Sequence, residues 1–170
     1  MNKIAQISFV QFKILLVFMG LSFASFSQDQ AISYKSIEDS VFQAGDKIKL
    51  LEIIYDSENN EVLPESYSTV NSIAEFLKKH PNMIVEVGVH TDSRGNHSHN
   101  EDVSYEQAKK LVSLLMNKFG VDRFHIKAKG YGESEPIIPD GEIADAPLNK
   151  QGILHQINQR TELKIIEIKN

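Results

Sequence analysis

Residues 83–95, MIVEVGVHTDSRG, carry most of the information about the fold of this chain. Residues 83–90 are rich in Ile and Val, which is typical of a strand. Residues 91–102 are polar and contain Gly95 and two Asn, which predicts a loop. An apolar stripe at helical spacing then predicts a second helix ending at Gly120, and its members are Ala108, Leu111, Val112 and Leu115.

The flanking sequence predicts one more helix and three more strands. Residues 47–55 are rich in Ile and Leu and predict a strand. Pro64 opens a helix that Pro81 stops, with Val70, Ile73, Ala74 and Leu77 on its apolar stripe. Residues 124–129 alternate as a half-exposed strand does, residues 130–152 read as a loop with three Pro and four Gly, and residues 163–168 read as a final strand. Two strand–helix–strand crossovers predict an α/β sandwich whose sheet is covered by helices on one side.

The composition predicts one domain and excludes several classes of function. The chain has 170 residues, 41% of them hydrophobic, and a formal net charge of −5. An acidic balance argues against nucleic-acid binding, which needs a basic face. The absence of cysteine excludes thiol nucleophiles, Cys-ligated zinc, iron–sulfur clusters and disulfides.

Residues 1–27 have the pattern of a cleaved signal peptide. They hold two lysines and no acid, then an apolar run and a series of small residues. The alternative, a transmembrane anchor, needs about 20 apolar residues, and this run is shorter. We therefore expect the mature protein to work outside the cytoplasm. Residues 28–45 are polar without a clear period and are interpreted as a lead-in segment.

Three motifs in order carry a resemblance to a known family. The first contains Thr91-Asp92, Gly95, Asn100, Val103-Ser104 and Ala108 at matching spacing, the second is Gly130-Tyr131-Gly132, and the third is Asn158-Gln159-Arg160-Thr161-Glu162. In this pattern the chain resembles the OmpA-like peptidoglycan-binding domain. The resemblance covers roughly residues 47–168 and implies a domain over residues 46–170 with a β-α-β-α-β-(loop)-β mixed sheet.

The resemblance implies non-covalent binding of peptidoglycan without an enzymatic step or cofactor. The implied ligand is the diaminopimelate of the stem peptide, whose ammonium would be received by Asp92. The residues assigned to ligand binding are Thr91, Asp92, Arg94, Gly95, Asn100, Val103, Gln107 and Arg160. The resemblance also implies a location in the periplasm or cell envelope, associated with the outer membrane. An outer-membrane or periplasmic protein is the expected partner there, contacted through residues 28–45.

The chain departs from the family pattern at Gln107, where the family has an arginine at the helix start that takes a ligand carboxylate. A hydrogen bond to a charged group contributes about 1.5–3 kcal/mol, and a neutral amide typically contributes less. Three interpretations follow. Arg94, Arg160 and the dipole of the second helix compensate, or the ligand differs, or binding is weak or lost. In the last case the domain would be a protein-interaction module.

Structural and metal-binding interpretations stand beside the ligand-binding one. Ser104 and Gln107 have the spacing of a helix capping box, which by itself would explain Gln107. Asp92 has the alternative role of a turn former. His90, His97 and His99 suggest a metal site, although no fixed helical spacing such as H-E-x-x-H accompanies them. The chain has no nucleophile elbow, P-loop or dinucleotide fingerprint, so no enzyme class is indicated.

Overall fold

The computed structural model describes residues 33–50 and 53–169. The predicted signal peptide and the first part of the lead-in segment lie outside the described residues. Residues 32–170 form one compact unit. Its elements are β1 (Tyr34–Lys35), β2 (Lys47–Lys49), η2 (Pro64–Ser66), α1 (Tyr67–Lys79), β3 (Met83–His90), α2 (His97–Asn117), η3 (Arg123–His125), β4 (Ile126–Gly132), α3 (Asp140–Asp145), α4 (Leu148–Asn158) and β5 (Arg160–Ile168).

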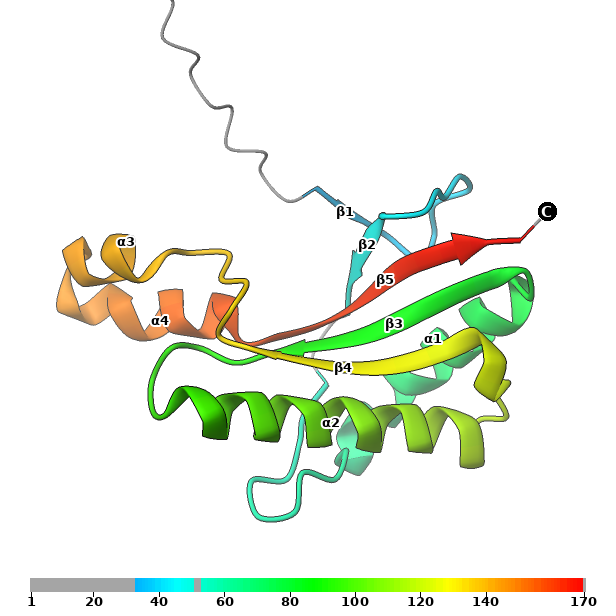
Figure 1. Ribbon diagram of the computed structural model, residues 1–170, viewed down its shortest axis with the longest axis horizontal. Coiled ribbons are helices and arrows are strands. Elements are labelled where there is room, and N and C mark those ends of the chain that lie inside the picture. Colours follow the sequence, from blue (N-terminus) through cyan, green and yellow to red (C-terminus); the bar gives the residue numbers. More distant parts are fainter. Residues whose placement is uncertain (1–32, 51–52, 170) are drawn as a thin grey trace, which may run out of the picture. The chain divides into compact units, whose positions relative to one another are not determined.

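The strands form a mixed sheet in the order β1-β2-β5-β3-β4. β3 runs parallel to β4, whereas β5 runs antiparallel to both β3 and β2. α1 and α2 lie on the same side of this sheet, and α3 and α4 lie beyond its end (Figure 1). The predicted mixed α/β sandwich is confirmed. None of the helices in the described part of the chain combines the length and the apolar character needed to cross a membrane.

The two faces of the sheet differ because β-strand side chains alternate. One face carries Val85, Val87 and Val89 of β3, which pack with the predicted apolar stripes of α1 and α2 in a single core. The opposite face carries charged residues, including Glu86 of β3 and Glu162 of β5. This charged face adjoins the candidate site described below.

Several predicted boundaries are wrong, three of them by more than three residues. Residues 97–102 belong to α2, which begins at His97 with the Asn96 side chain accepting from the His99 N–H. Residues 130–152 are not one loop, because they contain the end of β4, all of α3 and the start of α4. The first strand, expected over residues 47–55, ends at Lys49, although residues 51–52 lie outside the described part. Solvent-exposed helical turns lack the apolar period that marks a helix in a sequence.

Gly130 sets the spacing between β4 and α2. A Cβ at this position would lie 2.3 Å from the backbone nitrogen of Tyr105 and 2.6 Å from its Cα. Neither backbone atom can move away without shifting the whole helix. The absence of a side chain at residue 130 therefore allows α2 to pack directly on the strand.

We expect Gly130→Ala to lower the free energy of unfolding of the domain by about 3 kcal/mol, which is near the upper end of the cost of overpacking a protein core. Urea unfolding monitored by circular dichroism measures this change. Gly141→Ala in α3 is the matched control, since a Cβ there meets no atom within 4 Å. If both variants unfold at the same urea concentration, the close packing of α2 on β4 is not a stability determinant.

Candidate functional site

A cavity of about 930 Å³ opens at the carboxyl end of β3. Its walls come from the chain at and after the end of β2, from the loop after β3, from α2 and from the chain between the end of α4 and the start of β5. Seven of the eight residues expected to bind a ligand line it, namely Thr91, Asp92, Arg94, Asn100, Val103, Gln107 and Arg160. Gly95 does not line the cavity, but its φ of +107° allows the loop to turn.

Asp92 is buried in the cavity wall, and its carboxylate is fully hydrogen-bonded. The Arg94 side chain holds it with Nε 3.1 Å from Oδ1 and Nη2 2.7 Å from Oδ2, and the Arg94 backbone N–H donates to Oδ1 at 2.9 Å. The Gln159 side chain donates to Oδ2 at 2.6 Å. Burial by itself would raise the pKa of Asp92, but the hydrogen bonds from Arg94 outweigh it and lower the pKa. Asp92 is therefore a stable anion at neutral pH.

Asn100 fixes the shape of the loop that carries Asp92. Its side-chain amide donates to the carbonyl oxygens of Asp92 and Arg94 and, at 2.6 Å, to Glu133 Oε2. Glu133 lies in the turn after β4, so Asn100 ties two loops to the first turns of α2. Its contribution to the site is positional.

Gln107 lies in the third turn of α2, ten residues beyond the helix start at His97. The prediction that this position opens the helix is wrong. Because the helix dipole acts only over the first turn, it does not favour binding of an anion at Gln107. The Gln107 side chain instead donates from Nε2 to Asn60 Oδ1 at 3.3 Å.

The predicted capping box is also wrong. Ser104 Oγ donates to the Glu101 carbonyl and accepts from the Gly132 N–H at 2.9 Å. These contacts join the middle of α2 to β4 and leave Gln107 without a capping role.

Arg160 lines the cavity, yet its guanidinium is directed into the protein. The side chain is 1% exposed. Its Nε donates to Tyr34 Oη at 2.9 Å and lies 3.3 Å from Glu162 Oε2, and its Nη atoms donate to the carbonyls of Asn158 and Glu135. The expectation that Arg160 compensates at Gln107 is therefore not met by this geometry.

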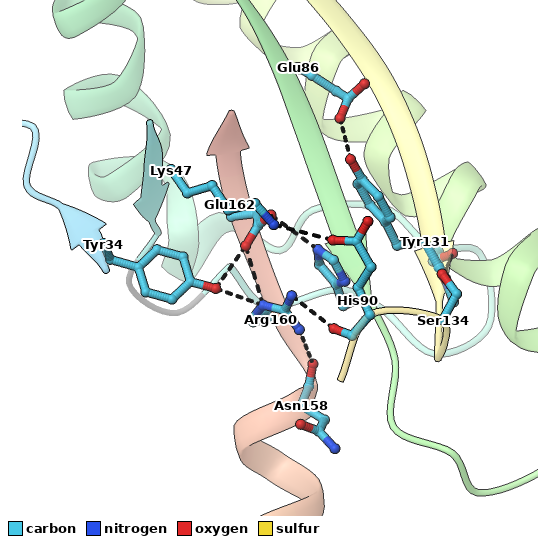
Figure 2. Close-up of polar contacts among 12 residues, drawn as sticks. Tyr34, Lys47, Glu86, His90, Tyr131, Ser134, Asn158, Arg160 and Glu162 are labelled. Carbon is cyan, nitrogen blue, oxygen red and sulfur yellow. Dashed lines mark hydrogen bonds and ion pairs between the residues drawn. The ribbon is translucent and has the colours of Figure 1, made fainter. Parts of the chain in front are cut away.

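Glu162 is the centre of a buried polar cluster on the face of the sheet opposite α1 and α2 (Figure 2). Tyr34 Oη donates to its Oε2 at 2.8 Å, and Lys47 Nζ lies 2.9 Å from its Oε1. Burial by itself would raise the pKa of Glu162. Contacts from His90, Lys47 and Tyr34 outweigh burial and hold this pKa far below its ordinary value.

His90 connects this cluster to the cavity. Its ring stacks on Tyr131 with centroids 4.5 Å apart, and Tyr131 Oη donates to Glu86 at 2.6 Å, as Figure 2 shows. Burial lowers the pKa of His90, so the ring is neutral at pH 7. Within the described residues, neither ring nitrogen makes a hydrogen bond, although Nε2 lies 3.4 Å from Glu162 Oε1.

Unsatisfied polar atoms at the cavity are consistent with a polar ligand. Thr91 Oγ1 and both ring nitrogens of His90 are buried without a hydrogen-bond partner among the described residues, and both side chains belong to residues that line the cavity. Buried polar groups in native proteins usually have partners, so an unpaired one needs an explanation.

The three histidines that suggest a metal site in the sequence are dispersed in the structure. His97 lies in the first turn of α2, where its Nδ1 is 3.3 Å from Glu133, and His99 is exposed on the same turn. His90 faces the buried cluster instead. Across residues 33–50 and 53–169, no three His, Asp or Glu side chains converge as metal ligands would.

The sequence analysis did not identify Gln156, Gln159 and Thr161 as cavity residues, although Gln159 and Thr161 belong to its third motif. Glu162 was part of a motif, but no role was assigned to it. These residues all lie where α4 ends and β5 begins, at the edge of the cavity. This shared position is the feature that could have identified them.

The pattern that defines the OmpA family matches residues 54–150, more than half of the chain. The chain belongs to the OmpA family. The matched residues include the loop with Asp92 and all of α2, so the predicted resemblance is confirmed.

Several known proteins resemble this chain in sequence or in fold. Outer membrane porin F of Pseudomonas aeruginosa is 30% identical over 59% of this chain, which spans only 29% of the porin. The peptidoglycan-associated lipoprotein of Buchnera aphidicola is 28% identical over 69% of this chain and 68% of the lipoprotein. The cell wall anchor of the T6SS from Pseudomonas aeruginosa has the same fold, with a TM-score of 0.53 and 22% identity over 71% of this chain and 78% of the anchor.

Proposed function

We propose that this OmpA domain attaches non-covalently to peptidoglycan, with Asp92 receiving the ammonium of diaminopimelate in the stem peptide. The observation that carries the proposal is the position of Asp92, which is a stable anion in the wall of the cavity. The peptidoglycan-associated lipoprotein and the cell wall anchor support it by the functions that their names state.

The ammonium would reach Asp92 by replacing Arg94. All the acceptor positions of the carboxylate are filled, so an incoming donor must displace one that is present. The Arg94 side chain is 60% exposed, whereas Asp92 is 5% exposed, so Arg94 can turn into solvent at little cost. Gln159 and the loop backbone would continue to hold the carboxylate in place.

Binding requires no chemical step. The cavity offers a carboxylate, amides and hydroxyls, and the proposed role of each is to hold a ligand group. Attachment of this kind is reversible, which suits a protein that must follow a growing wall. We accordingly propose that the domain is a scaffold and not an enzyme.

We also propose that the protein acts in the periplasm, after export by the signal peptide of residues 1–27. Part of the lead-in segment belongs to the domain itself, because β1 pairs with β2 and Phe42 packs on the core. The proposed contact with an outer-membrane or periplasmic protein is therefore best sought in residues 28–33, ahead of β1.

Co-sedimentation with purified sacculi tests the proposed function. We expect the protein to pellet with sacculi and to be released by an excess of soluble diaminopimelate-containing stem peptide. Protein that stays in the supernatant across a range of sacculus concentrations would eliminate the proposal.

Arg94→Ala is expected to strengthen binding of the stem peptide by about two- to tenfold. The physical reason is that the Arg94 guanidinium competes with the ligand ammonium for Asp92. Isothermal titration calorimetry measures the change, and Arg123→Ala, which removes an exposed arginine from η3, is the control. Weaker binding by Arg94→Ala would show that Arg94 holds the ligand instead of competing with it.

One observation favours a second candidate, a protein-interaction module that has lost peptidoglycan binding. The Asp92 carboxylate is already satisfied inside the protein, and the arginine of the family pattern is replaced by Gln107. In that case Asp92→Asn would leave the capture of an envelope protein unchanged, and no variant would pellet with sacculi.

A further inference from the structure

Three glutamines are among the polar residues that line the cavity. Gln107 comes from α2, Gln156 from the last turns of α4, and Gln159 from the residue that caps α4. A primary amide both donates and accepts hydrogen bonds, whereas a carboxylate only accepts and a guanidinium only donates. The wall is therefore suited to a ligand group that also does both.

The bonds that these amides already make leave their oxygen atoms available. Gln107 Nε2 donates to Asn60, and Gln159 Nε2 donates to Asp92. In the described part of the chain, neither Oε1 accepts a hydrogen bond, and the Gln156 side chain makes none. A ligand carboxylate placed against these oxygens could form no hydrogen bond with them, because both groups are acceptors. A ligand N–H group could donate a hydrogen bond to them.

The cations around the cavity are committed elsewhere. Arg94 holds Asp92, and Arg160 is turned toward Glu162. Lys49 lines the cavity, but it is opposite Glu162 in the β2–β5 register and so lies on the face of the sheet away from α2. In the free protein, a carboxylate near Gln107 would thus find no cation among the lining residues on its own side of the sheet that is not already paired.

We propose that this cavity recognises a stem peptide in which the side-chain carboxyl of diaminopimelate is amidated. The inference rests on the proposed function and adds the chemical class of the ligand. Asp92 would receive the ammonium. Gln107 Oε1 would accept from the ligand carboxamide, while its second Nε2 hydrogen would donate to the carboxamide oxygen.

This reciprocal pair explains why glutamine stands where the family pattern has arginine. An arginine would present only hydrogen-bond donors to the ligand. It could not accept a hydrogen bond from the NH2 group of a carboxamide. A glutamine satisfies both atoms of that group. The substitution at Gln107 then changes the preferred ligand and does not simply weaken the site.

Calorimetric titration of the protein with two soluble muropeptides tests the inference. The two ligands are identical except that the diaminopimelate side-chain carboxyl is amidated in one and free in the other. We expect about tenfold tighter binding of the amidated ligand. Equal or tighter binding of the free acid would overturn the inference and leave the proposed function standing. If neither ligand binds, the proposed function fails and the inference fails with it.

Gln107→Arg provides the reversal test. This variant should bind the free acid more tightly than the amidated ligand, because a charged donor then faces the carboxylate. Asn117→Arg adds the same charge to an exposed position at the other end of α2 and should keep the wild-type preference. If the control changes the preference as much as Gln107→Arg does, net charge governs the selectivity and the amide pairing is refuted.

Discussion

Asp92→Asn is expected to weaken binding to sacculi by about ten- to one-hundredfold, enough to leave the protein in the supernatant at concentrations where the wild type pellets. A hydrogen bond to a charged group contributes about 1.5–3 kcal/mol, and each 1.4 kcal/mol is about tenfold in affinity. Asparagine keeps the size of the side chain and an oxygen that accepts from the Arg94 N–H. The loss of affinity therefore measures the contribution of the negative charge and not a change in the shape of the loop.

Asp122→Asn is a closely matched control. Asp122 Oδ1 accepts from the backbone N–H two residues further along the chain at 2.9 Å, as Asp92 Oδ1 does. It lies at the start of η3 and does not line the cavity. Retained binding by Asp92→Asn, with a far-ultraviolet spectrum equal to that of the control, would remove Asp92 from the site.

Glu162→Ala is expected to reduce the free energy of unfolding by roughly 3–5 kcal/mol, the range for breaking a buried ion pair. The carboxylate is fully buried and neutralises Lys47 and Arg160, which would be left without it. Urea unfolding at pH 7 measures the effect. Glu167→Ala, at an exposed position of the same strand, should change the midpoint little.

The same cluster predicts how stability depends on pH. Because the pKa of Glu162 is lower in the folded than in the unfolded chain, its stabilisation is complete above the unfolded value, about 4.3. It is lost progressively as pH falls from there toward the folded value. Burial of neutral His90 also lowers stability as pH falls below about 6.5, because His90 is protonated at a higher pH in the unfolded chain than in the folded one.

Glu162→Gln separates these two contributions. The variant should be less stable than the wild type at pH 7, and its stability should fall less steeply between about pH 4.5 and 3. The matched substitution is Glu167→Gln. If Glu162→Gln and the wild type lose stability in parallel over this range, the lowered pKa of Glu162 does not contribute to acid unfolding.

The sequence predicted what depends on burial of apolar side chains. The Ile- and Val-rich run of residues 83–90 forms β3, and the stripes with Ile73 and Leu111 face the core. The family resemblance also assigned Asp92 and Gln107 to one ligand, and both residues line the same cavity. Both predictions rest on patterns that burial or shared ancestry imposes on neighbouring positions.

What the sequence missed either lacks an apolar period or depends on a polar contact between distant residues. The first turn of α2 is exposed and is fixed by Asn96, so no apolar period marks it. Leu148 and Ile153 of α4 are exposed, which hid that helix in an apparent loop. The burial of Arg160 could not be foreseen, because its partner Tyr34 lies 126 residues away.

The pairing of β1 with β2 has a mechanical consequence. If the cavity holds the wall while residues ahead of β1 hold another envelope component, any tension between the two must cross this pairing. It consists of only two residue pairs, and the Tyr34 hydroxyl fastens it to Glu162 and Arg160. Under load β1 would peel away before the rest of the sheet, lengthening the tether by about 3.3 Å for each residue released. Detachment of β1 would then absorb the tension while the domain stays bound to the wall.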